Sequence, residues 1–457
     1  MKVLGLLGMD RAVAFTFLAR LVSIAGSVGT VLLIVRFLSP VEQGYYYTLL
    51  SLVSLQMVFE LGFSFVIQQL TAHECARLEF GAEGGIAGDK EARARLASVL
   101  KLSVRWYSLA AAVMALALAP MGMIFFARSG ATGETSVAWQ GPWLCAVVAS
   151  SVGLWCLPFY SFLEGCGYVR EAAAMRLRQA AVGALSAWML MAMHHGLYSP
   201  AVVLMSQAAT GVHFIAGHRR LFKTVLHCRT ESFEVDWKNE VWPFQWRIAV
   251  SWMCSYFTAQ VLIPILFTLR GPVEAGQMGM SLSITGYMSA LVLPWISTKA
   301  TPFGRMVASG QFHSLDKLFR ETFGRAMAVF GVIALGACIG VALLPMISAR
   351  LAARIVSPRL FAVLVIAAGA NCAVQCLAIL LRSFKKEPFL VQSLIAAGLA
   401  VGLAVLVTPR WGSAGAVSSQ LAAFAAFALP SALYIFARSR REYLDDGVQV
   451  GLKGSAA

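Results

Sequence analysis

The chain is built from apolar runs of about 20 residues, the length that a helix needs to cross the hydrocarbon core of a membrane. Hydrophobic residues make up 59% of its 457 residues and charged residues 13%, against about 25% charged residues in a soluble domain. No charged block of about 100 residues is left over for a soluble domain. The sequence therefore predicts an all-α integral membrane protein with about twelve transmembrane helices, expected at 12–35, 45–70, 98–127, 142–163, 172–193, 199–222, 247–269, 276–298, 323–347, 360–381, 388–407 and 414–436.

Lysine and arginine are distributed unevenly between the expected loops. With the N-terminus placed inside, the cytoplasmic segments hold 28 of the 37 Lys and Arg residues and the outer loops hold 7. Because such residues are retained in cytoplasmic loops, we expect a multi-pass protein of a cell inner membrane with both termini in the cytoplasm. The net charge of +15 then has a topological origin, and no nucleic-acid partner is expected.

A short repeat divides the chain into halves. Pro40-Val-Glu-Gln-Gly follows the first predicted span, and Pro272-Val-Glu-Ala-Gly follows the seventh. Proline ends one helix and glycine allows a tight turn, so both stretches are expected to be outer turns of helical hairpins. The repeat predicts two pseudo-repeated six-helix bundles, a pattern frequent in transporters. The expected parts are an N-terminal bundle at 1–222, a cytoplasmic or interfacial linker at 223–246, a C-terminal bundle at 247–437 and a cytoplasmic tail at 438–457.

The stretch from Arg36 to Gly62 resembles the N-terminal signature of polysaccharide flippases, through Phe-Leu-Ser-Pro-Val-Glu-Gln-Gly-Tyr and then Phe-Glu-Leu-Gly-Phe. Ser39 stands where glycine is common in that family. The family belongs to the multidrug/oligosaccharidyl-lipid/polysaccharide exporter (MOP) superfamily, which also holds multidrug extruders and the lipid II flippase. The resemblance implies alternating access in two six-helix bundles. It also implies a lipid-diphosphate-linked oligosaccharide repeat unit as substrate, moved to the outer leaflet of a bacterial inner membrane for polysaccharide biosynthesis.

Two other functions stay open from the sequence. A cation-coupled multidrug extruder of the same superfamily would prefer an acidic cavity, and a membrane-bound envelope-assembly enzyme would need a long catalytic loop. The longest expected outer loop is only 128–141, and no nucleotide-binding or hydrolase motif occurs. We therefore expect no enzyme activity and no cofactor, with H⁺ or Na⁺ coupling as an open alternative. The expected partners are the lipid-linked oligosaccharide and membrane lipids, with other polysaccharide-assembly proteins as a further open class.

Two charged residues are expected deep inside the first two spans, where each costs about 2.5–3.5 kcal/mol on insertion scales. Arg20 and Glu60 fall at equal predicted depth on adjacent antiparallel helices. A guanidinium at this depth could bind a diphosphate through paired hydrogen bonds. Glu60 could hold Arg20 while the site is empty, or it could take up a proton. The alternative is a permanent Arg20–Glu60 pair that only locks the hairpin.

Polar stripes at helical spacing accompany these charges. Serines continue the faces headed by Arg20 and Arg247, and amides and hydroxyls that suit sugar hydroxyls continue the face of Glu60 from Gln56 to Gln68. Hydroxyl groups also mediate ordinary helix packing in membranes, and Arg247 could serve only as an interfacial anchor. The candidate substrate-binding residues are Arg20, Ser23, Ser27, Gln56, Glu60, Arg247, Ser251 and Ser255. No catalytic or metal-binding residues are expected.

Overall fold

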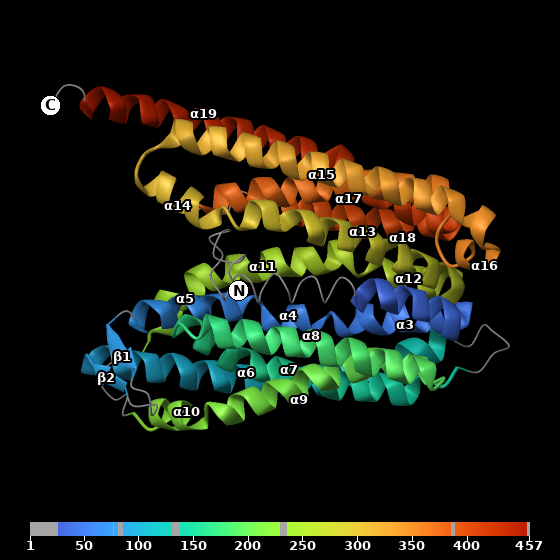
Figure 1. Cartoon of the computed structure of the whole chain (residues 1–457), viewed down its shortest axis with the longest axis horizontal. Helices are drawn as coiled ribbons and strands as arrows, with labels where there is room; N and C mark the ends of the chain where they lie inside the picture. Colours follow the sequence, from blue (N-terminus) through green and yellow to red (C-terminus); the bar gives the residue numbers. More distant parts are fainter. Residues whose placement is uncertain are drawn as a thin grey trace, which may run out of the picture. The chain divides into compact units, whose positions relative to one another are not determined.

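A computed structural model of the chain describes residues 26–75, 77–80, 86–129, 137–228, 235–384 and 389–454. Almost all of these residues are helical, which confirms the all-α prediction (Figure 1). The exception is a short antiparallel hairpin of β1 (Leu78–Phe80) and β2 (Ile86–Gly88), where Leu78 pairs with Gly88. The chain divides into two compact units, Met1–Met253 and Cys254–Ala457.

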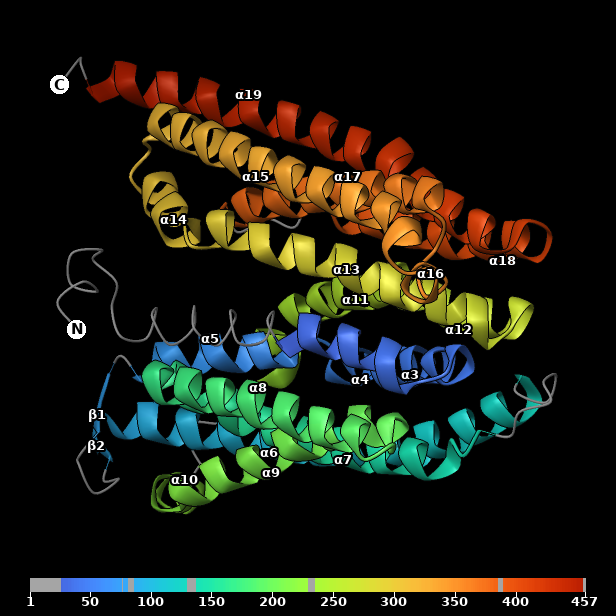
Figure 2. The ribbon, with the colours of Figure 1, turned by 45° about the vertical axis from the view of Figure 1, so that its right-hand side comes forward.

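The first unit begins, in its described part, with an apolar helix at Gly26–Phe37. Helices α6 to α9 run alongside one another in it, and α5 packs against both α6 and α7 (Figures 1 and 2). Its further helices are α3 (Pro40–Val53), α4 (Gln56–Glu60), α5 (Phe63–Cys75), α6 (Lys90–Ser129), α7 (Gln140–Gly165), α8 (Val169–Ala192), η2 (Gly196–Tyr198), α9 (Ser199–Gly217), α10 (Arg219–Leu226), η3 (Trp237–Val241) and most of α11 (Trp242–Ala259).

The second unit begins within the last turns of α11. In it α13 packs against α12, α15 and α17, and α17 also packs against α18 and α19. Its helices are α12 (Leu262–Arg270), α13 (Pro272–Ser297), α14 (Ala300–Ala308), α15 (Phe312–Ile347), α16 (Ala349–Ala352), α17 (Pro358–Arg382), α18 (Leu390–Leu421), η4 (Ala422–Ala428) and α19 (Leu429–Gly454).

Every one of the twelve predicted spans falls on helical segments wherever the chain is described. Among the described residues, eight helical stretches are long and apolar enough to cross a membrane, and the bent pair Pro40–Glu60 and Phe63–Cys75 adds a ninth. One of the eight, Leu390–Tyr443, contains two predicted spans joined at a non-helical residue, Gly412. The remaining spans correspond to α8, whose charged first turns lower its apolar content, and to Gly26–Phe37.

The two turns of the sequence repeat start their helices in different ways. In the first turn Ser39 and Glu42 form a capping box, in which each side chain accepts a hydrogen bond from the backbone of the other. In the second turn Gly271 takes the place of Ser39 and has no side chain that could cap. The matching carboxylate, Glu274, instead accepts hydrogen bonds from the backbone and hydroxyl of Ser413, at 2.9 and 2.8 Å. The same motif therefore ties α13 to the kink of α18 in the second unit.

Carbonyl groups that are freed at helix irregularities accept hydrogen bonds from glutamine side chains. Gln420 donates to Thr258 near the end of α11, and Gln392 donates to Ala428 at the end of the π-helix η4. In hydrocarbon an unpaired carbonyl costs several kcal/mol, so each interruption of a helix needs such a donor.

A buried carboxylate holds the C-terminal helix α19 against α15 within the second unit. Asp316 lies on α15 two turns before the predicted span 323–347, and Arg440 of α19 donates to both of its oxygens, at 2.6 and 2.9 Å. Arg320, one turn further along α15, donates to the same carboxylate. Tyr443 stacks on Phe384 beside this cluster. The segment expected as a tail at 438–457 thus continues α19 as a helix through Gly454.

The packing of α5 against α7 generates a first prediction. Gly165 allows this close approach, since a Cβ there would lie 2.6 Å from Cβ of Thr71. Just beyond, the Sγ atoms of Cys75 and Cys166 lie 3.2 Å apart. Mild oxidation with copper phenanthroline should therefore join these two thiols, and mass spectrometry of proteolytic peptides should detect the linked pair. Cys75→Ser is the control, and failure to link in the wild type would contradict the helix packing.

The Asp316 cluster generates a second prediction. Asp316→Asn should reduce the free energy of unfolding by about 2 kcal/mol, because hydrogen bonds to a charged group are lost. Burial raises the pKa of Asp316, and the hydrogen bonds from Arg440 and Arg320 lower it. The lowering is the larger effect, so the pKa of Asp316 in the folded protein lies below its ordinary value. The stabilisation is therefore complete above about pH 3.9 and is lost as the pH falls through the lower folded-state pKa.

Thermal unfolding of detergent-solubilised protein, followed by tryptophan fluorescence, measures this effect. The difference between wild type and Asp316→Asn should stay constant from about pH 8 to pH 5 and shrink only in stronger acid. The matched control is Glu442→Gln, because Glu442 forms an exposed pair with Arg438 at 3.1 Å. Such a pair contributes about 0.5 kcal/mol or less. Equal effects of the two substitutions would refute the role given to Asp316.

Candidate functional site

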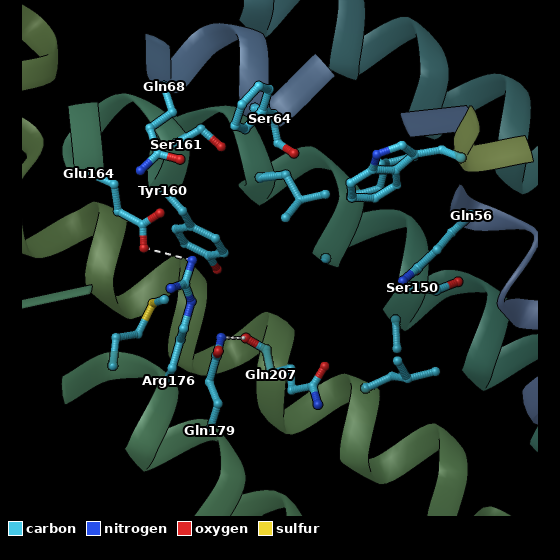
Figure 3. Close-up of a pocket in the computed structure, with 18 residues that line it drawn as sticks. Gln56, Ser64, Gln68, Ser150, Tyr160, Ser161, Glu164, Arg176, Gln179 and Gln207 are labelled. Carbon is cyan, nitrogen blue, oxygen red and sulfur yellow. Dashed lines mark hydrogen bonds and ion pairs between the residues drawn. The ribbon is translucent and has the colours of Figure 1, made fainter. Parts of the chain in front are cut away.

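A polar cavity of about 400 Å³ lies inside the first unit. Its walls are formed by α5, α7, α8 and α9, with Gln56 of α4 and Trp252 of α11 completing them (Figure 3). Its volume falls in the usual range of ligand sites, about 300–1,000 Å³. Amide, hydroxyl and charged groups line much of this cavity, although the surrounding helices are strongly apolar.

A break between α4 and α5 shapes one side of this region. Leu61 and Gly62 both have positive φ, at 54° and 65°, and the helical axis bends by 42° here. A side chain at Gly62 would be strained, since φ is positive and a Cβ would lie 2.5 Å from Cγ2 of Ile248 on α11. The break frees the carbonyl of Leu61, which accepts a hydrogen bond of 2.6 Å from the side chain of Gln245. The start of α11 is thereby fixed against the break.

The polar stripe expected from Gln56 to Gln68 is divided by this break. Gln56, Ser64 and Gln68 line the cavity. Glu60 lies immediately before the break, is buried, and accepts a hydrogen bond from the hydroxyl of Ser64. The carboxylate of Glu60 is therefore linked to the cavity through a serine that itself faces it.

An ion pair lies at the opposite side of the cavity from Gln56 and Ser150 (Figure 3). Nη2 of Arg176, on the second turn of α8, lies 2.6 Å from Oε1 of Glu164, at the end of α7. The Glu164 side chain is only 10% exposed, whereas that of Arg176 is 56% exposed. Among the described lining residues these two charges compensate one another, and the guanidinium is accessible to a ligand.

Several amides that line the cavity make no side-chain hydrogen bond to the described residues. Gln179 donates a hydrogen bond of 3.0 Å to the carbonyl of Gln207. The side chains of Gln56, Gln68 and Gln207 make no hydrogen bond within the described part of the chain. Because an amide side chain offers two donor hydrogens and one acceptor oxygen, these three groups can bind ligands that carry both donors and acceptors.

The other predicted site residues have different surroundings. Arg20 and Ser23 lie outside the described residues, as does the side chain of Ser255. Ser27 and Ser251 are half-buried. Arg247 is exposed, with its guanidinium carbon 5.6 Å from the centre of the Trp246 ring, a position that suits an interfacial anchor. That these residues bind substrate stays a prediction.

The structure adds Glu164, Arg176, Gln179 and Gln207 to the candidate residues. The sequence carried a signal for the first two, because charges between Glu164 and Arg178 interrupt the fourth and fifth predicted spans. Charges at this position indicate a cytoplasmic turn as readily as a cavity, so the pattern alone does not assign them to a site. Within the described residues, no group of three or more His, Cys, Asp or Glu side chains is arranged to hold a metal ion.

No family model and no curated protein sequence matches the chain. Its fold, however, matches solved structures of transporters. An inward-facing multidrug resistance MATE family transporter of the MOP superfamily gives a TM-score of 0.62 at 14% identity, covering 97% of this chain and 96% of the other. The MATE multidrug transporter DinF-BH gives 0.61 at 14% identity, covering 95% and 96%.

The lipid II flippase MurJ in an inward closed conformation is similar over the same extent. Its TM-score is 0.54 at 12% identity, and the match covers 97% of this chain and 92% of MurJ. At these identities the similarity establishes the fold alone, which this chain shares with these solved membrane transporters.

Proposed function

We propose that the chain is a flippase that moves a lipid-diphosphate-linked oligosaccharide across a bacterial inner membrane. The observation that carries this proposal is a polar cavity inside a fold shared with transporters, lined by three amides, Gln56, Gln68 and Gln207, whose side chains make no hydrogen bond within the described residues. Sugar hydroxyls both donate and accept hydrogen bonds, so amides that also do both are suited to them. Within a membrane these amides would otherwise be costly, which favours a role in binding.

The ion pair of Glu164 and Arg176 supports the diphosphate part of the substrate. A guanidinium binds phosphate oxygens through two parallel hydrogen bonds and does not lose its proton. Arg176 is the exposed partner of the pair, so its remaining donors can reach a ligand without a large rearrangement. Arg20 is proposed as a second contact to the diphosphate, as the sequence predicts.

A cation-coupled multidrug extruder is the second candidate. The multidrug transporters among the solved structures favour it, and so do Glu60 and the aromatic residues Phe65, Tyr160 and Trp252 that line the cavity. The acidic group that lines the cavity, Glu164, is already neutralised by Arg176. An organic cation would have to displace that guanidinium, whereas an anionic ligand would add to it. This difference favours the flippase.

The orientation and the partners belong to the same proposal. With both termini in the cytoplasm, Glu164 and Arg176 lie near the cytoplasmic end of α7 and α8, where a substrate made inside the cell would enter. Exchange of H⁺ or Na⁺ is proposed as the driving force, and other polysaccharide-assembly proteins are proposed as partners on either side of the membrane.

The opposite charges of the ion pair distinguish the two candidates. In a strain that depends on this protein, Arg176→Ala should lower export of the polysaccharide about tenfold or more, because a charge-assisted contact contributes about 1.5–3 kcal/mol. Arg176→Lys should retain part of the rate. Arg178→Ala on the same helix is the matched control, since Arg178 is also exposed but does not line the cavity.

For a multidrug extruder the pattern would be reversed. Arg176→Ala would release Glu164 and improve export of a cationic dye, and Glu164→Gln would impair it. Mass spectrometry of the lipid fraction should also detect a lipid-linked oligosaccharide that accumulates in the deletion strain. Its absence, together with the reversed pattern, would replace the flippase with the extruder.

Glu60 is the candidate for proton coupling. A buried carboxylate in a membrane is costly while charged, so proton uptake can be linked to a conformational change. Glu60→Gln keeps the shape and the contact with Ser64 but removes the charge. Transport into vesicles should then become insensitive to an imposed pH gradient, while the amount of folded protein stays normal. Glu171→Gln, an exposed position on α8, is the control.

If Glu60 instead has only a structural role, the Glu60→Gln variant should be poorly folded while its remaining transport keeps the pH response. Gel filtration of the fluorescently tagged protein separates this outcome from uncoupling.

A further inference from the structure

Two cysteine thiols lie against each other beside the polar cavity. Cys75 is the last residue of α5, Cys166 directly follows α7, and their Sγ atoms are 3.2 Å apart. Both residues are half-buried and so keep some exposure to solvent. A disulfide has an S–S distance of about 2 Å, so the two sulfurs have to approach by only roughly 1 Å. This α5–α7 thiol pair is therefore placed for oxidation with little movement of the helices.

Other cysteines have one of these two properties without the other. Cys372 and Cys376 lie one turn apart on α17, but both are fully buried. Cys228 is half-buried, but its thiol donates to the backbone carbonyl of Thr224. Proximity to a second thiol and exposure to solvent are combined in the α5–α7 thiol pair.

The thiol pair lies at the far end of a helix that begins at a break. α5 follows Leu61 and Gly62, where the axis bends by 42°, and such element ends are where helices pivot. Cys75 lies about 18 Å along α5 from Phe63, so a pivot of about 10° at the break moves it by roughly 3 Å. A disulfide holds its two Cβ atoms about 3.5–4.5 Å apart and does not permit such a movement.

The shape of the cavity depends on the position of α5. Ser64 and Gln68 of α5 line it, and so does Glu164 of α7, two residues before Cys166. A pivot of α5 therefore changes the separation of these two walls near the ion pair. A bond between the thiols fixes that separation.

We propose that the α5–α7 thiol pair is a site of oxidation by hydrogen peroxide, and that the disulfide formed there stops transport by fixing α5 against α7. This disulfide acts on the walls of the cavity, so it affects a lipid-linked oligosaccharide and an organic cation alike. The inference goes beyond the proposed function and does not depend on which of the two candidate functions is correct.

The reaction consumes both thiols and one peroxide. The hydrogen bond with Cys75, together with burial, raises the pKa of Cys166, so Cys166 keeps its proton and the sulfur of Cys75 attacks the peroxide. An S–O bond forms as the O–O bond breaks, which gives a sulfenic acid and, with a proton, water. The sulfur of Cys166 then attacks the sulfenic sulfur, and the hydroxide that leaves takes the proton of Cys166 as a second water. The two sulfurs lose two electrons in total, and these reduce the peroxide.

Purified full-length protein in nanodiscs tests the site without a substrate. After brief exposure to hydrogen peroxide, mass spectrometry should detect peptides linked through Cys75 and Cys166, and dithiothreitol should separate them. Cys228 should be oxidised about tenfold more slowly, because it has no neighbouring thiol among the described residues. Cys372 should stay reduced, because it is fully buried.

Transport is then measured in cells, as export of the polysaccharide or, for an extruder, of the cationic dye. A pulse of hydrogen peroxide should abolish export by the wild type until a reductant restores it. Cys228→Ser, the matched control, should behave in the same way. Cys75→Ser and Cys166→Ser cannot form the bond, so their export should continue through the pulse. If one of these two variants does not fold, the other supplies the comparison.

Three outcomes overturn the inference. If peroxide leaves both thiols reduced, the pair is not an oxidation site. If the linked wild type still exports at its normal rate, the disulfide forms but does not restrain transport. If Cys75→Ser loses export during the pulse as the wild type does, the peroxide acts at another place. Failure of the proposed function is a separate result, because it is read from the lipid fraction of the deletion strain and leaves the dye measurement in force.

Discussion

The need to pair every backbone carbonyl inside hydrocarbon governs this structure. In a regular helix every carbonyl is paired within the helix itself, but several helices of this chain are interrupted and leave carbonyls unpaired. At the break between α4 and α5 the donor is Gln245, near the end of α11 it is Gln420, and at the end of η4 it is Gln392. Near Pro409 and Gly412 of α18, Arg270 donates to the carbonyl of Thr408. Each irregularity is thus stabilised by a long polar side chain from another helix.

Whether a glutamine side chain pairs with a freed carbonyl distinguishes the glutamines that stabilise the fold from those available to a ligand. Gln245, Gln392 and Gln420 are buried and each donates to a carbonyl, so their amides stabilise the fold. Gln56, Gln68 and Gln207 face the cavity, and their side chains have no such partner among the described residues. The amino-acid sequence alone does not distinguish these six glutamines. Only the geometry of the helix breaks shows which amides the fold uses and which it leaves open.

The sequence predicts the helices well because their cause is local. A run of about 20 apolar residues has no stable alternative to a helix in a membrane, and the described helices fall where these runs occur. The repeat of Pro40 and Pro272 is equally local, since both prolines occupy the first turn of a helix. The partner of Glu42 is local, because Ser39 lies only three residues away, but the partner of Glu274 could not be foreseen, because Ser413 lies 139 residues away.

The site was predictable only in part, for the same reason. The spacing of Gln56, Ser64 and Gln68 placed them on one stripe, and all three line the cavity. The break at Leu61 and Gly62 was not foreseen, because a single Leu-Gly pair in an apolar run also occurs in straight helices. Arg176 and Glu164 lie where charges interrupt the fourth and fifth predicted spans, and such charges also occur at ordinary cytoplasmic turns. Their pairing depends on the packing of α8 against α7, which no local pattern encodes.

The ion pair gives the cavity a property that neither charge would provide alone. A lone arginine at this site would carry an uncompensated charge, and a lone carboxylate would repel a diphosphate. Paired, Arg176 is held by Glu164 at 2.6 Å while it stays more than half exposed. On the proposed function, a diphosphate binds to the remaining donors of Arg176 while Glu164 keeps its partner, so neither charge of the pair is left uncompensated. Coupling to a proton is then the role of Glu60, which lies outside the pair and is linked to the cavity through Ser64.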